Sequence, residues 1–157
     1  MLLEKCQLCT QLKAFSKFYT VLAPNRVMEE YSVGDGESPK PNIELFKQVF
    51  NPIDVKADDD LLPYFFNESA SGEFWVISYA RQHPEFTCVI DETFGRSICE
   101  TLGVKVTGTI GIIRGMKNKG LLTVEDLKAT RLAIMKSRFY LSAKLLRELD
   151  EICGSTI

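Results

Sequence analysis

Two short apolar segments separated by a helical pattern constrain the fold more than any other feature of this chain. Residues 87–90 form a compact apolar run that ends on Asp91, and residues 104–106 form a second run. Residues 93–101 between them have helical spacing and stop before Gly103, a residue suited to the left-handed conformation after a helix. Short buried strands joined by a helix are typical of a parallel sheet, because parallel strands need a crossover connection. The sequence therefore predicts an α/β fold.

The same alternation of helical and strand patterns continues along the rest of the chain. Strand-like runs occur at residues 19–23 and 53–57, and residues 33–41 concentrate Gly, Ser and Pro as in a surface loop. Helical patterns are predicted at residues 2–15, 25–31, 42–50, 58–60, 73–82, 110–116, 123–136 and from 142 onward. This order favours a parallel sheet covered by helices.

Size and composition indicate one domain over residues 1–157. A chain of this length with 45% hydrophobic residues can fill a single core. No apolar run approaches the about 20 residues of a membrane-spanning helix, and the N-terminus does not follow a signal-peptide pattern. The five cysteines are odd in number and fit free thiols in a reducing compartment. We therefore expect a cytoplasmic protein without membrane contact.

Basic residues concentrate toward the C-terminus. Residues 114–147 contain nine basic and two acidic residues, a net charge of +7 in a chain whose total is −2. Lys117 and Lys119, near the start of this segment, are the residues that we expect to contact nucleic-acid phosphates. A basic segment beside acidic clusters suits an enzyme that acts on a phosphodiester backbone. A solvated helix surface produces the same pattern, and charge alone does not choose between the two.

Acidic residues stand where predicted strands end or the next helices begin. Asp91 and Glu92 follow the strand at 87–90, Glu30 lies one short helix after the strand at 19–23, and Glu73 begins a helix. Ligands commonly bind at the carboxyl ends of parallel strands, and carboxylate oxygens suit Mg²⁺ and Mn²⁺. Acidic residues at helix N-termini are also favoured by the helix dipole in any protein. Glu73 and Glu92 therefore have a structural explanation as well as a catalytic one.

Five short motifs follow one another along the chain in a fixed order. They are P-x-x-V-x-x-E ending at Glu30, G-E at Glu73, D-E-x-x-G-R from Asp91 to Arg96, L-G-V-K-V-T-G-T-I-G from Leu102 to Gly111, and K-x-x-G-L from Lys117 to Leu121. This order and spacing resemble an uncharacterised PIN-like nuclease subfamily of archaea and bacteria. The resemblance covers residues 2–147, and residues 91–121 are its specific part.

The resemblance implies a three-layer α/β/α domain with a central, mostly parallel sheet, and an activity that hydrolyses RNA with Mg²⁺ or Mn²⁺. Glu30, Glu73 and Asp91 would be the catalytic, metal-binding acids, and Glu92 stands where the subfamily often has a second Asp. Arg96 would contact a phosphate or hold a neighbouring carboxylate in place. Many relatives are thought to be the toxin of a toxin–antitoxin pair, which implies RNA and an antitoxin protein as partners.

One departure from the family pattern concerns the N-terminus. PIN-like domains begin with a strand that ends on an Asp, and this sequence starts at what resembles the end of that strand. We therefore expect the N-terminal strand and the first acid to be missing from this sequence, with two alternatives: a partner chain fills the gap, or the natural start lies upstream of Met1. Two rivals to an active ribonuclease follow: an inactive PIN-like module that binds RNA or protein, and a homo-oligomer in which another copy closes the open sheet.

Other motifs indicate structure rather than chemistry. Cys6 and Cys9 have the spacing of half a metal knuckle, but no second pair accompanies them, and core packing explains them better. His83, the only histidine, directly precedes Pro84 and has no supporting catalytic motif. Trp75 and its neighbouring aromatics can stack on bases, although aromatic residues at helical spacing more often belong to a core.

Overall fold

Capping side chains set several helix boundaries of this chain. The structure is a computed structural model that describes residues 7–33 and 42–154. The side chains of Asn42 and Ser142 each accept a hydrogen bond from the backbone N–H three residues later. Thr123 and Asp126 form a reciprocal capping box, and Gly103 ends its helix with a φ of 68°. These contacts satisfy backbone groups that helix ends leave without partners, and they confirm the predicted boundaries.

The described residues form two compact units. One lies within residues 20–108, and the other combines the described parts of residues 1–19 and 109–157. A single domain over residues 1–157 stays a prediction. Within the described ranges, none of the helices has the length and apolar character needed to cross a lipid bilayer.

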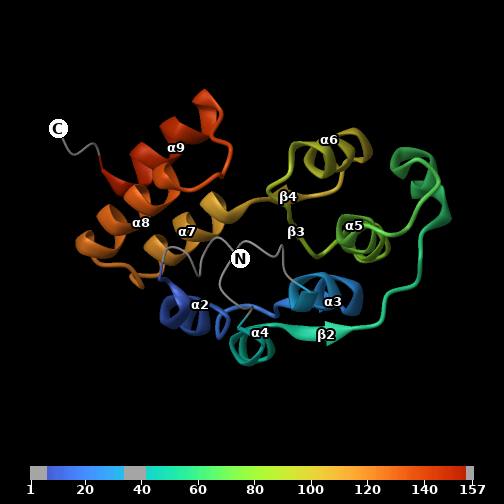
Figure 1. Ribbon diagram of the computed structural model, residues 1–157, viewed down its shortest axis with the longest axis horizontal. Coiled ribbons are helices and arrows are strands. Elements are labelled where there is room, and N and C mark those ends of the chain that lie inside the picture. The colour runs from blue at the N-terminus through green and yellow to red at the C-terminus, as the bar shows by residue number, and fades with distance from the viewer. Residues whose placement is uncertain (1–6, 34–41, 155–157) are drawn as a thin grey trace. The chain divides into compact units, whose positions relative to one another are not determined.

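Short parallel strands and helices make up the unit of residues 20–108 (Figure 1). Strand β1 pairs in parallel with β2, and β3 pairs in parallel with β4. Parallel strands alternating with helices confirm the α/β class, although the strands described form two separate pairs instead of one sheet. The elements in chain order are β1 (Leu22–Pro24), α3 (Asn25–Val33), α4 (Ile43–Val49), β2 (Asn51–Ile53), the 3-10 helix η1 (Asp59–Phe65), α5 (Gly72–Gln82), β3 (Cys88–Val89), α6 (Thr93–Leu102) and β4 (Val106–Thr107).

The strands are shorter than the sequence predicts, and their positions are shifted. The strand predicted at 53–57 is wrong, because β2 ends at Ile53 and contains Pro52. Pro52 lies opposite Ala23 of β1 in the parallel register. A proline has no N–H to donate and is tolerated where that group is not needed by a neighbouring strand. The alternating apolar pattern therefore predicts that a strand lies near these residues, but it does not predict where the strand begins and ends.

A hydrophobic core joins η1, α5, β3 and α6. Phe74 and Ile77 of α5 are fully buried within it. Trp75 packs at its border and donates its indole N–H to the carbonyl of Ser69 at 2.8 Å. The core explanation of these aromatics is thus confirmed for Phe74. The buried members of the core are Leu61, Phe65, Phe74, Ile77, Ala80, Cys88, Ile90, Ile98 and Cys99.

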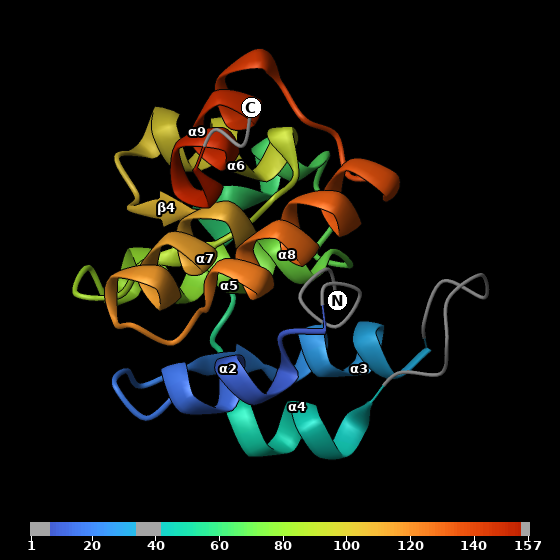
Figure 2. The ribbon, with the colours of Figure 1, turned by 90° about the vertical axis from the view of Figure 1, so that its left-hand side faces the viewer.

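The second unit is helical in its described part and contains α2 (Cys9–Phe15), α7 (Thr109–Asn118), α8 (Val124–Lys136) and α9 (Ala143–Cys153). Figure 2 shows α7, α8 and α9 as neighbouring helices, and α9 contacts both others. A Cβ on Gly115 of α7 would lie 3.0 Å from ring atoms of Phe15, so glycine at this position leaves room for that ring. The predicted start of the first helix at residues 2–6, with Cys6, and most of the predicted loop, 34–41, lie outside the described residues.

We predict that Thr123→Ala lowers the free energy of unfolding by about 1 kcal/mol, because it removes one half of the capping box at the start of α8. Chemical denaturation monitored by circular dichroism measures the change. Thr101→Ala is a matched control, since Thr101 lies on α6 and its hydroxyl only bonds back to the carbonyl of Ser97. Equal stability of the Thr123 variant and wild type would contradict the role of this cap.

Candidate active site

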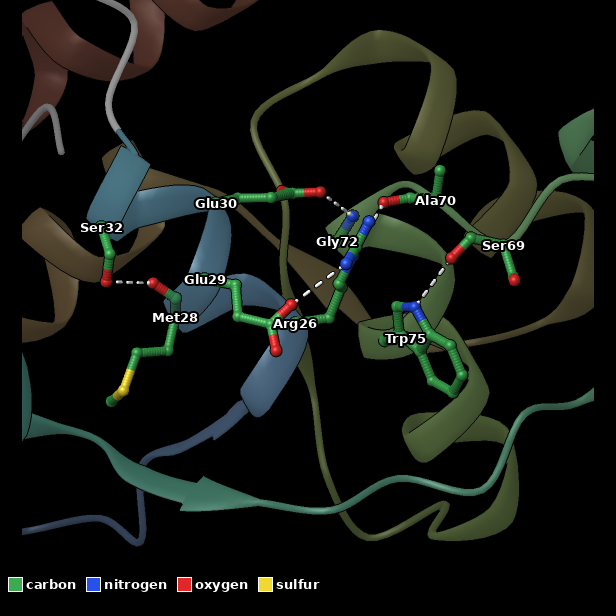
Figure 3. Close-up of polar contacts among 9 residues, drawn as sticks. All are labelled: Arg26, Met28, Glu29, Glu30, Ser32, Ser69, Ala70, Gly72 and Trp75. Carbon is green, nitrogen blue, oxygen red and sulfur yellow. Dashed lines mark hydrogen bonds and ion pairs between the residues drawn. The ribbon is translucent and has the colours of Figure 1, made fainter.

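Glu30 reaches from α3 to the first turn of α5. Its Oε1 accepts a hydrogen bond from the Gly72 N–H at 2.7 Å, and Figure 3 shows the side chain extending toward that backbone. Arg26, one turn earlier on α3, donates to the carbonyl of Ala70 at 3.3 Å and to Glu29 at 3.0 Å. A carboxylate at a helix N-terminus is favoured by the helix dipole and by the N–H groups that lack helical partners there. These contacts hold α3 against the start of α5.

Glu73 follows Gly72 directly and faces α6. Its backbone N–H donates to the N-cap hydroxyl of Ser71 at 3.2 Å. Burial raises the pKa of the Glu73 carboxyl above its ordinary value of 4.5, and the negative charges of Glu92 and Glu30 raise this pKa further. Three predicted site residues, Glu30, Glu73 and Glu92, therefore lie close enough to interact electrostatically.

Asp91 lies just beyond β3 and shares its surroundings with Arg96. A Cβ built on Gly108 would lie 2.7 Å from Asp91 Oδ1 and 3.1 Å from Arg96 Nη1. The same Nη1 donates to the carbonyl of Ile90 at 3.0 Å. Arg96 thus anchors the backbone immediately before Asp91 and places a positive charge near its carboxylate. The sequence offered two roles for Arg96, and this geometry supports the one that positions a neighbouring acid.

Each of the three principal acids approaches a glycine so closely that a side chain there would collide with it. A Cβ on Gly72 would lie 2.5 Å from Glu30 Oε2, and a Cβ on Gly95 would lie 2.9 Å from Glu73 Oε2. Gly108 stands in the same relation to Asp91. The motifs contained these glycines, but sequence patterns alone did not reveal that each one makes room for a carboxylate.

The acids do not form a ready-made coordination sphere. Over residues 7–33 and 42–154, no group of three or more His, Cys, Asp or Glu side chains is placed to hold a metal ion. Glu30 is hydrogen-bonded to Gly72, and Glu92 occupies the N-cap position of α6 without a capping hydrogen bond from its side chain. The metal-binding role of Glu30, Glu73, Asp91 and Glu92 stays a prediction.

Asp54 is a further acid near a strand end that the sequence did not single out. It follows β2, and its Oδ1 accepts a hydrogen bond from the side chain of Asn25, which follows the paired strand β1. The predicted strand at 53–57 had placed Asp54 in its middle. Had the strand been predicted to end at Ile53, Asp54 would have been a candidate site residue, because it would directly follow a strand as Asp91 does.

The two predicted nucleic-acid lysines already have partners within their own unit. Lys117 Nζ donates to the carbonyl of Ile152 at 2.5 Å, near the end of α9. Lys119 Nζ lies 5.0 Å from the ring centre of Phe18 and 5.9 Å from that of Tyr19. Lys119 is exposed, and its ammonium group makes no hydrogen bond to the described residues, so an anion can still reach it. Lys119 is therefore the better candidate for a phosphate contact.

Comparison with known proteins finds one family match. A family model described as a PIN domain matches residues 2–154. The matched range includes residues of both compact units, and it contains all seven site residues that the sequence predicted. No curated protein and no solved structure matches the chain.

We predict that Glu73→Gln stabilises the protein at pH 7, because a raised pKa means that the ionised carboxylate disfavours the folded state. This penalty is fully present above the folded-state pKa and disappears as the pH falls below 4.5, where the group is protonated in both folded and unfolded chains. Thermal midpoints at pH 7 and pH 4 measure the difference. Glu100→Gln, on the exposed side of α6, is the control. A stabilisation that is equal at both pH values would contradict the electrostatic origin.

Proposed function

Because the chain belongs to the PIN-domain family, we propose that it is a divalent-metal-dependent ribonuclease that hydrolyses RNA phosphodiester bonds. PIN domains generally use divalent metal ions and commonly bind RNA. The observation that carries the proposal is the gathering of Glu92 and Glu30 near the partly buried Glu73, whose pKa is raised by burial and by these two negative charges. A fold does not by itself imply an activity, so the proposal rests on this site.

The donor set fits Mg²⁺ or Mn²⁺. Glu30, Glu73, Asp91 and Glu92 supply carboxylate oxygens, which hard divalent cations prefer over nitrogen or sulfur. Burial raises the pKa of Glu73, and the negative charges of Glu92 and Glu30 raise it further; a cation held among these carboxylates would offset the part that comes from charge. When bound, such an ion supplies charge stabilisation at the phosphate and a more acidic water.

The protein's own residues have separate tasks in this proposal. Glu73 can accept a proton from the attacking water, and burial, the largest cause of its raised pKa, favours this role. Arg96 holds the backbone at Ile90 and keeps Asp91 in place. Glu30 is oriented by the Gly72 N–H.

Three further predictions stay untested by the described contacts. They are a three-layer arrangement, an antitoxin partner and self-association.

A catalytically inactive module that binds RNA or protein is the second candidate function. It is favoured by one observation, that the described acids form no group of three ligands in metal-binding geometry. The two candidates differ in one measurement, since an inactive module would bind RNA but leave it intact with Mn²⁺ or Mg²⁺ present.

We predict that the wild type cleaves single-stranded RNA when Mn²⁺ is added, and that Asp91→Asn lowers the rate at least about tenfold. The rate is followed on a fluorescently labelled RNA, with Glu100→Gln as a control that keeps its activity. Gly95→Ala is a second variant, because its Cβ would lie 2.9 Å from Glu73 Oε2 and would displace that carboxylate.

For Gly95→Ala we expect a lowered but measurable thermal midpoint, since the added methyl group would also lie 3.0 Å from Ile90 Cγ2, which belongs to the hydrophobic core. Mn²⁺ affinity measured by calorimetry should fall by about 10- to 100-fold. RNA left intact by the wild type at all Mn²⁺ concentrations would overturn the ribonuclease and leave the inactive module.

We also predict that Lys119→Gln weakens RNA binding and lowers the slope of log affinity against log salt by about 1, because one phosphate contact is lost. Fluorescence anisotropy over a salt series measures both quantities. Lys47→Gln on α4, outside the basic segment, is the matched control. Lys117 is a poorer test, because its replacement would also remove the hydrogen bond to Ile152. Identical slopes for the Lys119 variant and wild type would exclude this lysine from the RNA-binding surface.

A further inference from the structure

Two phenylalanine rings lie at the surface of the unit that contains the acids. Phe66 is 82% exposed and Phe94 is 45% exposed. Their rings are nearly parallel, with an interplanar angle of 8° and centroids 6.2 Å apart. Phe94 also packs edge-on against Phe65, which in turn packs edge-on against the buried ring of Phe74. The exposed pair, called here the Phe66–Phe94 shelf, is therefore supported from the hydrophobic core.

The backbone at Phe66 is held in a conformation that a phenylalanine rarely adopts. Phe66 has a φ of 55° and the following Asn67 a φ of 59°, both in the left-handed region. Phe66 caps the end of η1, where its N–H and that of Asn67 both bond to the carbonyl of Leu62. Glycine or asparagine is the usual residue at such a cap, and a bulky residue there costs free energy. An exposed aromatic ring in a disfavoured backbone conformation is an observation that points to a role in binding.

The shelf adjoins the candidate active site through α6. Phe94 is the second residue of this helix, Glu92 is its N-cap, and the next residue, Gly95, contacts the carboxylate of Glu73. RNA that approaches these acids meets negative charge, which repels its phosphates. Where no cation offsets this charge, affinity close to the acids comes from contacts that do not depend on phosphate charge, and stacking on an aromatic ring is such a contact.

We propose that the Phe66–Phe94 shelf stacks a nucleobase of single-stranded RNA next to the scissile phosphate. This inference rests on the proposed ribonuclease function and adds a base-binding subsite to it. Every base has a flat face, so the shelf favours unpaired RNA over a duplex without selecting one base sequence. Phe66 provides the exposed stacking surface, and Phe94, fixed by Phe65, holds that ring in position.

The test measures binding of a labelled single-stranded oligoribonucleotide in EDTA, which prevents cleavage, and of the same strand without bases. We expect Phe66→Asn to weaken binding to the normal strand about tenfold or more and to leave binding to the abasic strand unchanged. The loss should be the same at low and high salt. Phe66→Tyr should restore binding, and Tyr140→Ala is a control that removes a ring of similar exposure, 76%, from the other unit.

We expect the thermal midpoint of Phe66→Asn to equal or exceed the wild-type value, because asparagine tolerates the left-handed region. Equal RNA binding by wild type and Phe66→Asn overturns the shelf, as does an equal loss on normal and abasic strands. Self-association of the wild type that Phe66→Asn abolishes, with RNA binding unchanged, would assign the shelf to a protein contact and also overturn the inference. If the wild type cleaves RNA and Phe66→Asn binds RNA normally, the shelf is refuted and the proposed function is not. If the wild type leaves RNA intact, the proposed function is refuted.

Discussion

The hydrogen bond from the Gly72 N–H to the Glu30 carboxylate is the contact on which the candidate site depends. It joins residues 42 positions apart in sequence and places a negative charge at the first turn of α5. A side chain at position 72 would meet Glu30 Oε2 at 2.5 Å, so only glycine permits this approach. Since Glu73 is the next residue, the same bond brings two carboxylates together and contributes to the raised pKa of Glu73. One backbone N–H thus adds a second carboxylate to the surroundings of Glu73, whose pKa is raised first by burial, then by Glu92 and by Glu30.

Features that depend on neighbouring residues in sequence could be predicted, and features that depend on distant pairing could not. The helix starts at Asn42, Thr123 and Ser142 were correct because each capping bond spans only three residues. The strands have two or three residues each, and their ends are set by partners elsewhere in the chain. The strand at 53–57 was therefore misplaced, and the acid that follows β2, Asp54, was overlooked.

The residues of the candidate site also fall into two groups, those that local sequence could predict and those that it could not. The acids were found because carboxylates after strands and at helix starts follow a recognisable pattern. Their partners were not, because no local pattern shows that Gly95 faces Glu73 or that Gly108 faces Asp91. Phe66 gave no signal either, since a phenylalanine is not a residue expected in the left-handed region. The partners of Lys119, two aromatic rings about 100 positions earlier in the chain, depend on tertiary packing as well.

The acids and the lysines of the proposed function lie in different units, and this separation of charge has a physical consequence. All four candidate metal-binding acids and Arg96 lie within residues 20–108, whereas Lys117 and Lys119 lie in the helical unit. The spacing of the acids is set by contacts within one unit. In the proposed function, attraction for a polyanion would come mainly from the basic segment 114–147 and would be weakened by salt, whereas stacking on the Phe66–Phe94 shelf would not. High salt should therefore reduce RNA capture long before it disturbs the carboxylates, because hydrogen bonds and glycine contacts, not screened long-range charge, hold those side chains in place.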